Sequence, residues 1–200
     1  MNIADDNGGS GGNTMLNEKE FYFVRHGQTD WNVAHRAQGQ TDVPLNAKGR
    51  REAKEAAEAA AQLKFGAICS SPLSRAVETA EAIANATGGK VSIHEELKEC
   101  SWGVREGDTK GAWFEKWKRG IETPIGSELY EEFLSRAVGA INQALNEPGP
   151  VLIVAHGGIY WAVQLHALRN MDHDLKNATI VKHTPPSEQH PWWSTSIVNS

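Results

Sequence analysis

Two histidines, each placed where a short apolar run ends and a glycine begins, are the residues in this sequence best suited to chemistry. His26 follows the run at residues 21–24, with Arg25 between them, and His156 directly follows the run at residues 151–155. Apolar runs of this length that stop abruptly are typical of buried strands. Because open α/β sheets place their ligand sites at the carboxyl ends of strands, we expect the two histidines to share one site.

The side chains around these histidines suit an anionic ligand. A histidine can act as a neutral nucleophile or as a general base near neutral pH. Arg25 offers forked donors that match phosphate or carboxylate. Arg75 lies near the start of a helix predicted at residues 74–86. A cation there opposes the helix dipole unless an anion is close, so Arg75 is interpreted either as a phosphate ligand or as a solvated surface arginine.

The middle of the chain holds carboxylates and aromatic residues that have two interpretations each. Glu99 and Glu106 lie in an acidic segment at residues 95–107. Such a segment is usually solvated surface, but either residue is a candidate general acid. Residues 110–119 interleave three aromatic side chains with basic ones. We favour a helix that packs its rings on the core over a cap that closes a pocket.

Composition limits the class of protein. The chain has 200 residues, of which 40% are apolar and 22% charged, which suits one globular domain. The net charge of −5 argues against a general nucleic-acid binder. Neither a membrane-spanning run nor a signal-peptide core stands out, so we expect a cytoplasmic protein. Cys69 and Cys100 are interpreted as free thiols, with a structural disulfide as the alternative.

The order of predicted elements indicates the fold. Residues 1–17 contain a glycine-rich stretch and are expected to form a flexible tail, with one domain at residues 18–200. Strands are predicted at residues 21–24, 67–69, 91–93, 151–155, 179–182 and 194–198, and helices at 47–64, 74–86, 131–146 and 159–169. This alternation predicts a three-layer α/β/α sandwich with a mainly parallel sheet.

Several motifs in this order are those of a known family. They are Arg25-His26-Gly27-Gln28-Thr29-Asp30-Trp31-Asn32, Gln38-Gly39-Gln40-Thr41-Asp42-Val43-Pro44-Leu45, Ser70-Ser71-Pro72-Leu73-Ser74-Arg75-Ala76, Leu97-Lys98-Glu99 with Trp102-Gly103 and Glu106-Gly107, and Ala155-His156-Gly157-Gly158. From Phe21 onward the chain resembles the histidine phosphatase superfamily, in its phosphoglycerate mutase-like branch. One departure is Gly126-Ser127-Glu128, where that family often has Gly-Glu-Ser.

The resemblance implies a role for each matching residue. His26 would be the nucleophile that becomes phosphorylated, and Glu99 the proton donor, with Glu106 as the competing candidate. The remaining expected site residues are Arg25, Arg75 and His156 around the transferred phosphoryl group, Asn32 and the amide of Gly157 assisting them, and Gln38, Gly39 and Glu106 lining the substrate site. We expect no metal and no cofactor, because the two arginines would repel a divalent cation.

The function predicted on this basis is metal-independent hydrolysis of a phosphomonoester. The runner-up is a phosphoglycerate mutase, which the basic residues Lys110, Lys116, Lys118 and Arg119 would support, although the short segment at residues 107–126 argues for a phosphatase. A non-catalytic phosphate-binding module is a third hypothesis, against which the intact set of histidines, arginines and Glu99 speaks. The expected partner is a small phosphorylated substrate, without nucleic acid or membrane. A homodimer could form through a strand edge or Trp192-Trp193.

Overall fold

A six-stranded sheet forms the centre of the protein, as described by a computed structural model for residues 15–168 and 175–199. The strand order is β3-β2-β4-β1-β5-β6. The strands are β1 (Phe21–Arg25), β2 (Ala67–Ser70), β3 (Val91–Ile93), β4 (Val151–Ala155), β5 (Ile180–Thr184) and β6 (Ser194–Ile197). The first four run parallel, whereas β5 is antiparallel to β1 and β6 to β5. The predicted mainly parallel sheet is confirmed.

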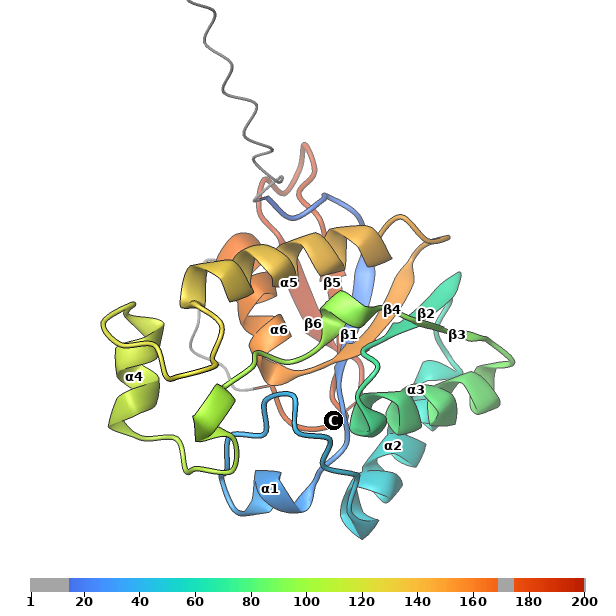
Figure 1. Ribbon diagram of the computed structural model, residues 1–200. Coiled ribbons are helices and arrows are strands. Elements are labelled where there is room, and N and C mark those ends of the chain that lie inside the picture. Colours follow the sequence, from blue (N-terminus) through green and yellow to red (C-terminus); the bar gives the residue numbers. More distant parts are fainter. Residues whose placement is uncertain (1–14, 169–174, 200) are drawn as a thin grey trace, which may run out of the picture.

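Helices cover both faces of the sheet, so the predicted three layers are confirmed (Figure 1). The helices α2 (Ala47–Ala60) and α3 (Ser74–Thr87) lie on one side, and α5 (Tyr130–Ala144) and α6 (Gly157–Val163) on the other. Each face of the sheet has its own hydrophobic core, and successive residues of β1 point to opposite faces. Phe21 and Phe23 pack with α5 and α6, whereas Tyr22 and Val24 pack with α2 and α3. Strands buried on both faces read as continuous apolar runs for this reason.

Short elements fill the connections that carry the expected site residues. They are α1 (Asp30–Val33), 3₁₀ turns at Glu95–Leu97 and Gly103–Arg105, and α4 (Ala112–Lys118). A π-helical stretch at Gln164–Leu168 continues α6. The helix expected at residues 159–169 therefore begins two residues earlier, and Arg169 lies outside the described residues. Asn46 caps α2 as its residue type predicts, because its side chain accepts a hydrogen bond from the Gly49 N–H at 2.8 Å.

The aromatic segment around α4 belongs to the core, as preferred from the sequence. Phe114 is 7% exposed and Trp117 is fully buried. Trp102 packs edge-on against Trp117 with ring centroids 4.4 Å apart. Edge-to-face contacts of this kind add to the free energy gained by burial. The buried rings of the segment therefore pack against the loop that carries Glu99 rather than closing over a pocket.

The packed part of the chain begins before residue 18. Leu16, placed in the tail by the sequence, is 5% exposed and belongs to the main core. The amide of Asn17 donates to Asn142 Oδ1 on α5 at 2.8 Å, and Asn142 Nδ2 donates to the Met15 carbonyl at 2.9 Å. The expected tail is thus too long by at least these residues, and its remainder, residues 1–14, lies outside the described residues.

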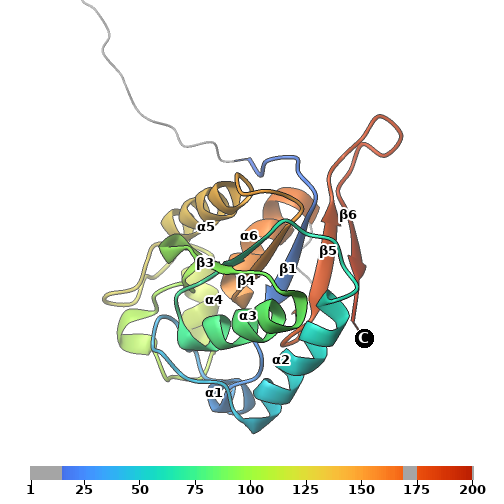
Figure 2. The ribbon, with the colours of Figure 1, turned by 90° about the vertical axis from the view of Figure 1, so that its right-hand side faces the viewer.

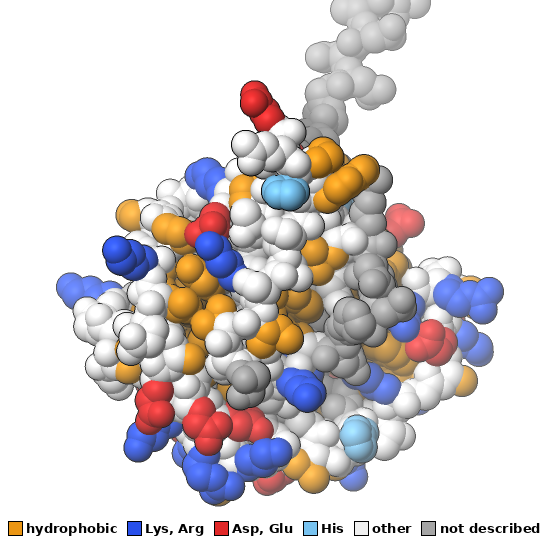
Figure 3. Space-filling model, turned by 180° about the vertical axis from the view of Figure 1, so that it is seen from behind, with side chains coloured by type: hydrophobic (Ala, Val, Ile, Leu, Met, Phe, Trp, Pro, Cys, Tyr) orange, Lys and Arg blue, Asp and Glu red, His pale blue; other side chains and the backbone are white. Residues whose placement is uncertain are grey.

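The hairpin of β5 and β6 projects beyond the other elements at one edge of the sheet (Figure 2). Trp192 and Ile197 on this hairpin are 65% and 66% exposed. Seen from behind, the molecule shows hydrophobic side chains gathered toward the middle of the face with charged ones around them (Figure 3). β6 is the last strand at this edge of the sheet, and its residues are exposed.

The structure bears on two expectations from the sequence, the lack of a membrane-spanning segment and the state of the two cysteines. Within residues 15–168 and 175–199, none of the helices has the length and apolar character needed to cross a membrane. Cys69 and Cys100 are both buried free thiols. Burial raises the pKa of the Cys69 thiol to about 12, with Glu147 as a second cause, so this side chain behaves as a small apolar core residue.

Candidate active site

The two histidines lie side by side because β1 and β4 are neighbours in register. Arg25 pairs with Ala155 at the ends of the two strands, so His26 and His156 are each the next residue. The His26 N–H donates to the Ala155 carbonyl at 3.0 Å, and the two ring centroids are 5.2 Å apart. His26 is 3% exposed and His156 is fully buried. The structure thus brings together the two residues expected to share a site.

The ring of His26 is held in one tautomer. Its Nδ1 lies 2.7 Å from the Gly27 carbonyl oxygen. A carbonyl only accepts hydrogen bonds, so Nδ1 carries the proton and Nε2 keeps its lone pair. Burial lowers the pKa of His26 well below its usual value, the charges of Arg75 and Arg25 lower it further, and the Gly27 hydrogen bond opposes them. His26 is therefore neutral at pH 7 and has a nucleophilic nitrogen available.

Arg75 is fully buried, which excludes the solvated surface arginine considered from the sequence. Its Nη2 donates to the Gly39 carbonyl at 2.8 Å and its Nη1 to the Thr41 carbonyl at 3.0 Å. Burial lowers the pKa of Arg75 to about 10, opposed by Glu99, Asp42 and Glu106, so it stays protonated at pH 7. Its Nε is buried without a hydrogen-bond partner among the described residues. A buried donor of this kind is suited to an anion.

His156 has a partner that the sequence did not single out. Its Nε2 lies 2.7 Å from Ser71 Oγ, which also accepts from the Leu73 N–H at 3.3 Å. A hydroxyl can both accept and donate, and with Ser71 as the donor to Nε2 the proton of His156 lies on Nδ1. That nitrogen is buried and has no partner in the described part of the chain. Burial lowers the pKa of His156 well below its usual value, and Arg75, His26 and Arg25 lower it further, so the ring is neutral.

Glu99 reaches the start of α6, just after His156, from the loop between β3 and α4. Its Oε1 accepts from the Cys100 N–H at 2.9 Å, and its Oε2 from the Gly158 N–H at 3.0 Å. A Cβ at position 158 would collide with the Glu99 carboxylate, so only glycine permits this approach. Gly158, quoted as part of a motif but given no role from the sequence, therefore fixes the carboxylate at the start of α6.

A cavity of about 330 Å³ contains four of the expected residues: Arg25, Asn32, Glu99 and Gly157. Its other walls are Trp31, His35, Arg36, Thr109, Lys110, Gly158, Tyr160, Trp161 and Leu175. A larger cavity of about 780 Å³ lies between the C-terminal ends of α2 and α3, and no expected site residue lines it. His26, Arg75 and His156 are not among its lining residues, but Arg25 and Gly157, which do line the smaller cavity, are the direct chain neighbours of the two histidines. The smaller cavity is therefore the candidate ligand site, because charged and aromatic groups converge there beside the histidine pair.

Glu106 is used differently from Glu99. Its carboxylate accepts from the backbone N–H groups of Gln40 at 3.0 Å, Thr41 at 2.8 Å and Trp102 at 3.2 Å. It also accepts from the Thr41 hydroxyl, and it is not among the residues lining the cavity. Glu106 thus holds the loop whose carbonyls bind Arg75. Gly39 allows this contact, because its φ of +54° and the nearby Glu106 carboxylate both exclude a side chain.

Asn32 and Gln38 are tied to the loop that follows β1. Asn32 forms a capping box with Thr29 at the start of α1. Gln38 is 8% exposed, and its Oε1 accepts from Thr29 Oγ1 at 3.0 Å. Asn177, which the sequence did not suggest, donates from Nδ2 to the His26 carbonyl at 2.9 Å and to Asn32 Oδ1 at 3.3 Å. Asn32 lines the cavity, whereas Gln38 does not and contacts the loop through Thr29.

Acidification is expected to destabilise the protein through its buried neutral histidines. Burial lowers the pKa of His183, stacked on Phe21, to about 4. An unfolded histidine binds a proton below about pH 6.5, whereas the folded one does not until its lower pKa. The stability that such a residue gives in its neutral form is fully present above about pH 6.5. As the pH falls below that value, each such residue lowers the free energy of unfolding by up to about 1.4 kcal/mol per pH unit. Urea unfolding at about pH 7.5 and about pH 5.5 measures this loss.

The variant His183→Phe isolates one contribution to this pH dependence. Phenylalanine keeps an aromatic ring against Phe21 and removes the titrating group. We expect its free energy of unfolding to fall less steeply with acid than that of the parent. A pH dependence equal to the parent's would contradict the assignment.

Comparisons with known proteins identify the family of this chain. Residues 21–187 match the family described as histidine phosphatase superfamily (branch 1). A probable phosphoglycerate mutase GpmB of Proteus mirabilis is 40% identical over 149 residues, which are 69% of each chain. A Bacillus subtilis protein called uncharacterized phosphatase PhoE is 35% identical over 161 residues, which are 79% of this chain and 81% of that one.

Solved structures share the same fold. A mycobacterial glucosyl-3-phosphoglycerate phosphatase, solved with VO₃, has a TM-score of 0.74 at 27% identity, covering 89% of this chain and 96% of that one. A phosphoserine phosphatase of Entamoeba histolytica, solved with 3-phosphoglyceric acid, has a TM-score of 0.72 at 25% identity, covering 90% and 96%. With the family match over most of its length, this chain belongs to branch 1 of the histidine phosphatase superfamily.

Proposed function

We propose that the protein is a metal-independent phosphatase that hydrolyses a small phosphomonoester through a phosphohistidine on His26, with Glu99 as proton donor. One observation carries the proposal: a neutral His26 lies beside a neutral His156, with the charged Arg25 and Arg75 acting on both rings. Phosphoryl transfer depends mainly on positioning and on stabilising charge on the equatorial oxygens. Two arginines and a second histidine supply both.

The first step transfers the phosphoryl group to the protein. Nε2 of His26 attacks phosphorus, an N–P bond forms, and the ester P–O bond breaks. Arg25, Arg75 and His156 donate hydrogen bonds to the phosphoryl oxygens, and the buried Nε of Arg75 and Nδ1 of His156 are donors without other partners among the described residues. Glu99 gives a proton to the leaving alkoxide, which departs as the alcohol.

The second step returns His26 to its starting state. Glu99, now a carboxylate, removes a proton from a water molecule in the cavity, and the water oxygen attacks phosphorus. The N–P bond breaks and inorganic phosphate is released. The Gly27 carbonyl, 2.7 Å from Nδ1, keeps the ring in the same tautomer throughout. No metal takes part in either step, since the clustered arginine charges already neutralise the phosphoryl group and would repel a divalent cation.

A phosphatase fits the cavity better than a mutase does, although relatives include a probable phosphoglycerate mutase. Of the basic residues that supported a mutase, only Lys110 lines the cavity. Lys116 is ion-paired with Glu122 at 2.8 Å, and Lys118 with Glu115 at 3.0 Å. The residues of α4 therefore do not supply the additional substrate contacts that a mutase would require to retain and turn its intermediate.

Two cations in the cavity support a substrate with a second anionic group. Arg36 is anchored by a hydrogen bond from Nη1 to the Gly107 carbonyl at 2.9 Å. The ammonium of Lys110 lies 4.8 Å from the ring centroid of Phe114 and 5.3 Å from that of Trp161. Both residues line the cavity beyond Arg25. A carboxylate carried by the leaving group would meet these two charges.

The variant Arg36→Gln tests this preference. We expect the parent to favour 3-phosphoglycerate over glycerol 3-phosphate, which has a hydroxymethyl group in place of the carboxylate. Arg36→Gln should reduce the ratio of the two kcat/KM values about tenfold, the effect of losing a charged hydrogen bond. Arg119→Gln, an exposed cation outside the cavity, is the control and should leave the ratio unchanged. An unchanged ratio in Arg36→Gln would remove Arg36 from substrate selection.

The proposed activity itself is tested by phosphate release from 4-nitrophenyl phosphate with a chelator present. Release that resists the chelator supports metal-independent hydrolysis. Absence of release from this substrate and from a panel of natural phosphomonoesters would contradict a phosphatase. A coupled mutase assay on the same protein would then test the runner-up.

A further inference from the structure

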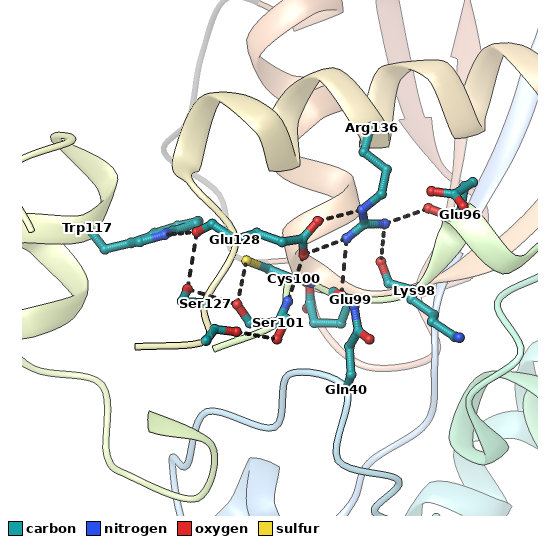
Figure 4. A network of polar contacts seen from close by, with 11 residues as sticks. Gln40, Glu96, Lys98, Glu99, Cys100, Ser101, Trp117, Ser127, Glu128 and Arg136 are labelled. Carbon is teal, nitrogen blue, oxygen red and sulfur yellow. Dashed lines mark hydrogen bonds and ion pairs between the residues drawn. The ribbon is translucent and has the colours of Figure 1, made fainter. Parts of the chain in front are cut away.

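An ion pair outside the cavity holds the loop that carries Glu99 (Figure 4). Arg136 on α5 binds Glu128 with two parallel hydrogen bonds, Nε to Oε1 at 2.7 Å and Nη2 to Oε2 at 2.8 Å. Their side chains are only 18% and 22% exposed. Bidentate pairs of this kind are the strongest and most geometrically specific of protein ion pairs. The pair is therefore a rigid unit rather than a mobile surface contact.

The other donors of Arg136 bind the backbone on both sides of the Glu99 Cα. Nη1 donates to the carbonyls of Glu96 at 2.7 Å and Lys98 at 3.0 Å, and Nη2 donates to the Glu99 carbonyl at 3.3 Å. Gln40 Nε2 also donates to the Glu99 carbonyl, at 3.2 Å. One guanidinium thus donates hydrogen bonds to three carbonyls of this segment, which has no regular secondary structure of its own at Glu99.

Glu128 fixes the segment just after Glu99. Its Oε2 accepts from the Ser101 N–H at 2.8 Å, and its own N–H donates to the Ser101 carbonyl at 3.1 Å. Ser127 Oγ donates to the same carbonyl at 2.8 Å. Ser127 and Glu128, where the sequence departs from the family's usual order, are therefore both part of this network. The backbone before and after Glu99 is held by one connected set of charged hydrogen bonds.

Arg136 does not line the cavity, and its N–H donors are already engaged by Glu128 and by three backbone carbonyls, so none is left for a substrate. Burial lowers the pKa of Arg136, but the hydrogen bond and charge of Glu128 outweigh burial and leave this pKa above its usual value. The guanidinium is thus charged under all ordinary conditions. Its effect on the reaction must pass through the position of Glu99, whose carboxylate is otherwise held by the amides of Cys100 and Gly158.

We propose that Arg136, paired with Glu128, is a positioning residue that sets Glu99 at the distance required for proton transfer to the leaving group. This inference rests on the proposed function, in which Glu99 is the proton donor. A general acid works only within hydrogen-bond reach of the oxygen it protonates. A displacement of about 1 Å can reduce a rate by about a hundredfold. Loss of the pair should therefore weaken proton donation without removing the nucleophile or the phosphate ligands.

The experiment compares substrates that differ in their need for the proton. Arg136→Met keeps much of the side-chain volume and removes the charge and the donors. We expect kcat/KM for glycerol 3-phosphate, an alkyl ester, to fall about tenfold to a hundredfold. For 4-nitrophenyl phosphate, whose leaving group departs without protonation, we expect a loss below about threefold. The quantity kcat/KM is used because it reports the step in which the leaving group departs.

Two further variants keep the test decisive. Arg136→Lys retains a positive charge but cannot bind two carboxylate oxygens and three carbonyls, so it should show a smaller change in the same direction. It also serves if Arg136→Met does not fold. Arg50→Met is the matched control, because Arg50 forms an ion pair of 2.6 Å with Glu78 between α2 and α3, away from the Glu99 loop. It should leave the ratio of the two kcat/KM values unchanged.

A double variant separates a positioning role from a general loss of stability. If Arg136 acts through Glu99, adding Arg136→Met to Glu99→Gln should change the substrate ratio no further. Equal losses on both substrates in the Arg136 variants, or a further change of ratio in the double variant, would overturn the positioning role. If Glu99→Gln alone leaves the ratio unchanged, the proton-donor assignment fails and this proposal fails with it. Phosphate release by the parent that depends on His26 shows that the proposed hydrolysis stands in either case.

Discussion

Replacing His26 by alanine is expected to lower kcat/KM for 4-nitrophenyl phosphate by more than about 10⁴-fold. The reason is that the neighbouring ring of His156 offers no equivalent nitrogen among the described residues. The Nε2 of His156 already interacts with Ser71 Oγ at 2.7 Å. The loss should be similar for alkyl esters, since every substrate passes through the same nucleophile. Phosphate release with a chelator present, measured beside the parent, gives the comparison.

The control is His190→Ala, because His190 is exposed in the connection between β5 and β6. It should retain full activity. The parent, quenched during turnover, should carry a phosphoryl label that acid removes, and His26→Ala should carry none. Unfolding in urea shows whether the fold is retained. Release that His26→Ala retains would remove His26 as the nucleophile.

Replacing Glu99 by glutamine is expected to have the second largest effect, and one that depends on the substrate. A general acid contributes about 10² to 10⁴-fold when the leaving group requires a proton. We therefore expect kcat/KM for glycerol 3-phosphate to fall within that range, and kcat/KM for 4-nitrophenyl phosphate to fall much less. The slope of log kcat/KM against the pKa of a series of leaving alcohols measures the same difference in one plot.

Glu106→Gln is the comparison for this prediction. Glu106 accepts backbone N–H groups of Gln40, Thr41 and Trp102 and does not line the cavity. Its substitution should loosen the loop that binds Arg75 and reduce activity on both substrates alike. Equal losses from Glu99→Gln on the two substrates would point instead to Glu106 or to water as the acid.

The arrangement of the layers and the shared place of the two histidines follow from local sequence. Strands buried on both faces must be apolar throughout, so residues 151–155 are recognisable without a structure. Parallel neighbours end at the same edge, so His26 and His156 meet there. The capping role of Asn46 is also local, since it depends only on the residue type before a helix. Periodicity and chain direction suffice to place both histidines at this edge, whereas the pairing of β1 with β4 is seen in the structure.

The tertiary structure alone decided which groups in the loops meet. Glu99 and Glu106 have the same chemistry and lie seven residues apart in one acidic loop, yet Glu99 alone lines the cavity. The sequence was compatible with Arg75 on the surface or in the site, and its burial in the structure excludes the surface. Arg136 reads as an ordinary helix residue, and only packing brings it to the carbonyl of Lys98, 38 residues earlier. Spacing along the chain specifies which face of an element a residue occupies, but contacts between loops depend on how distant elements pack.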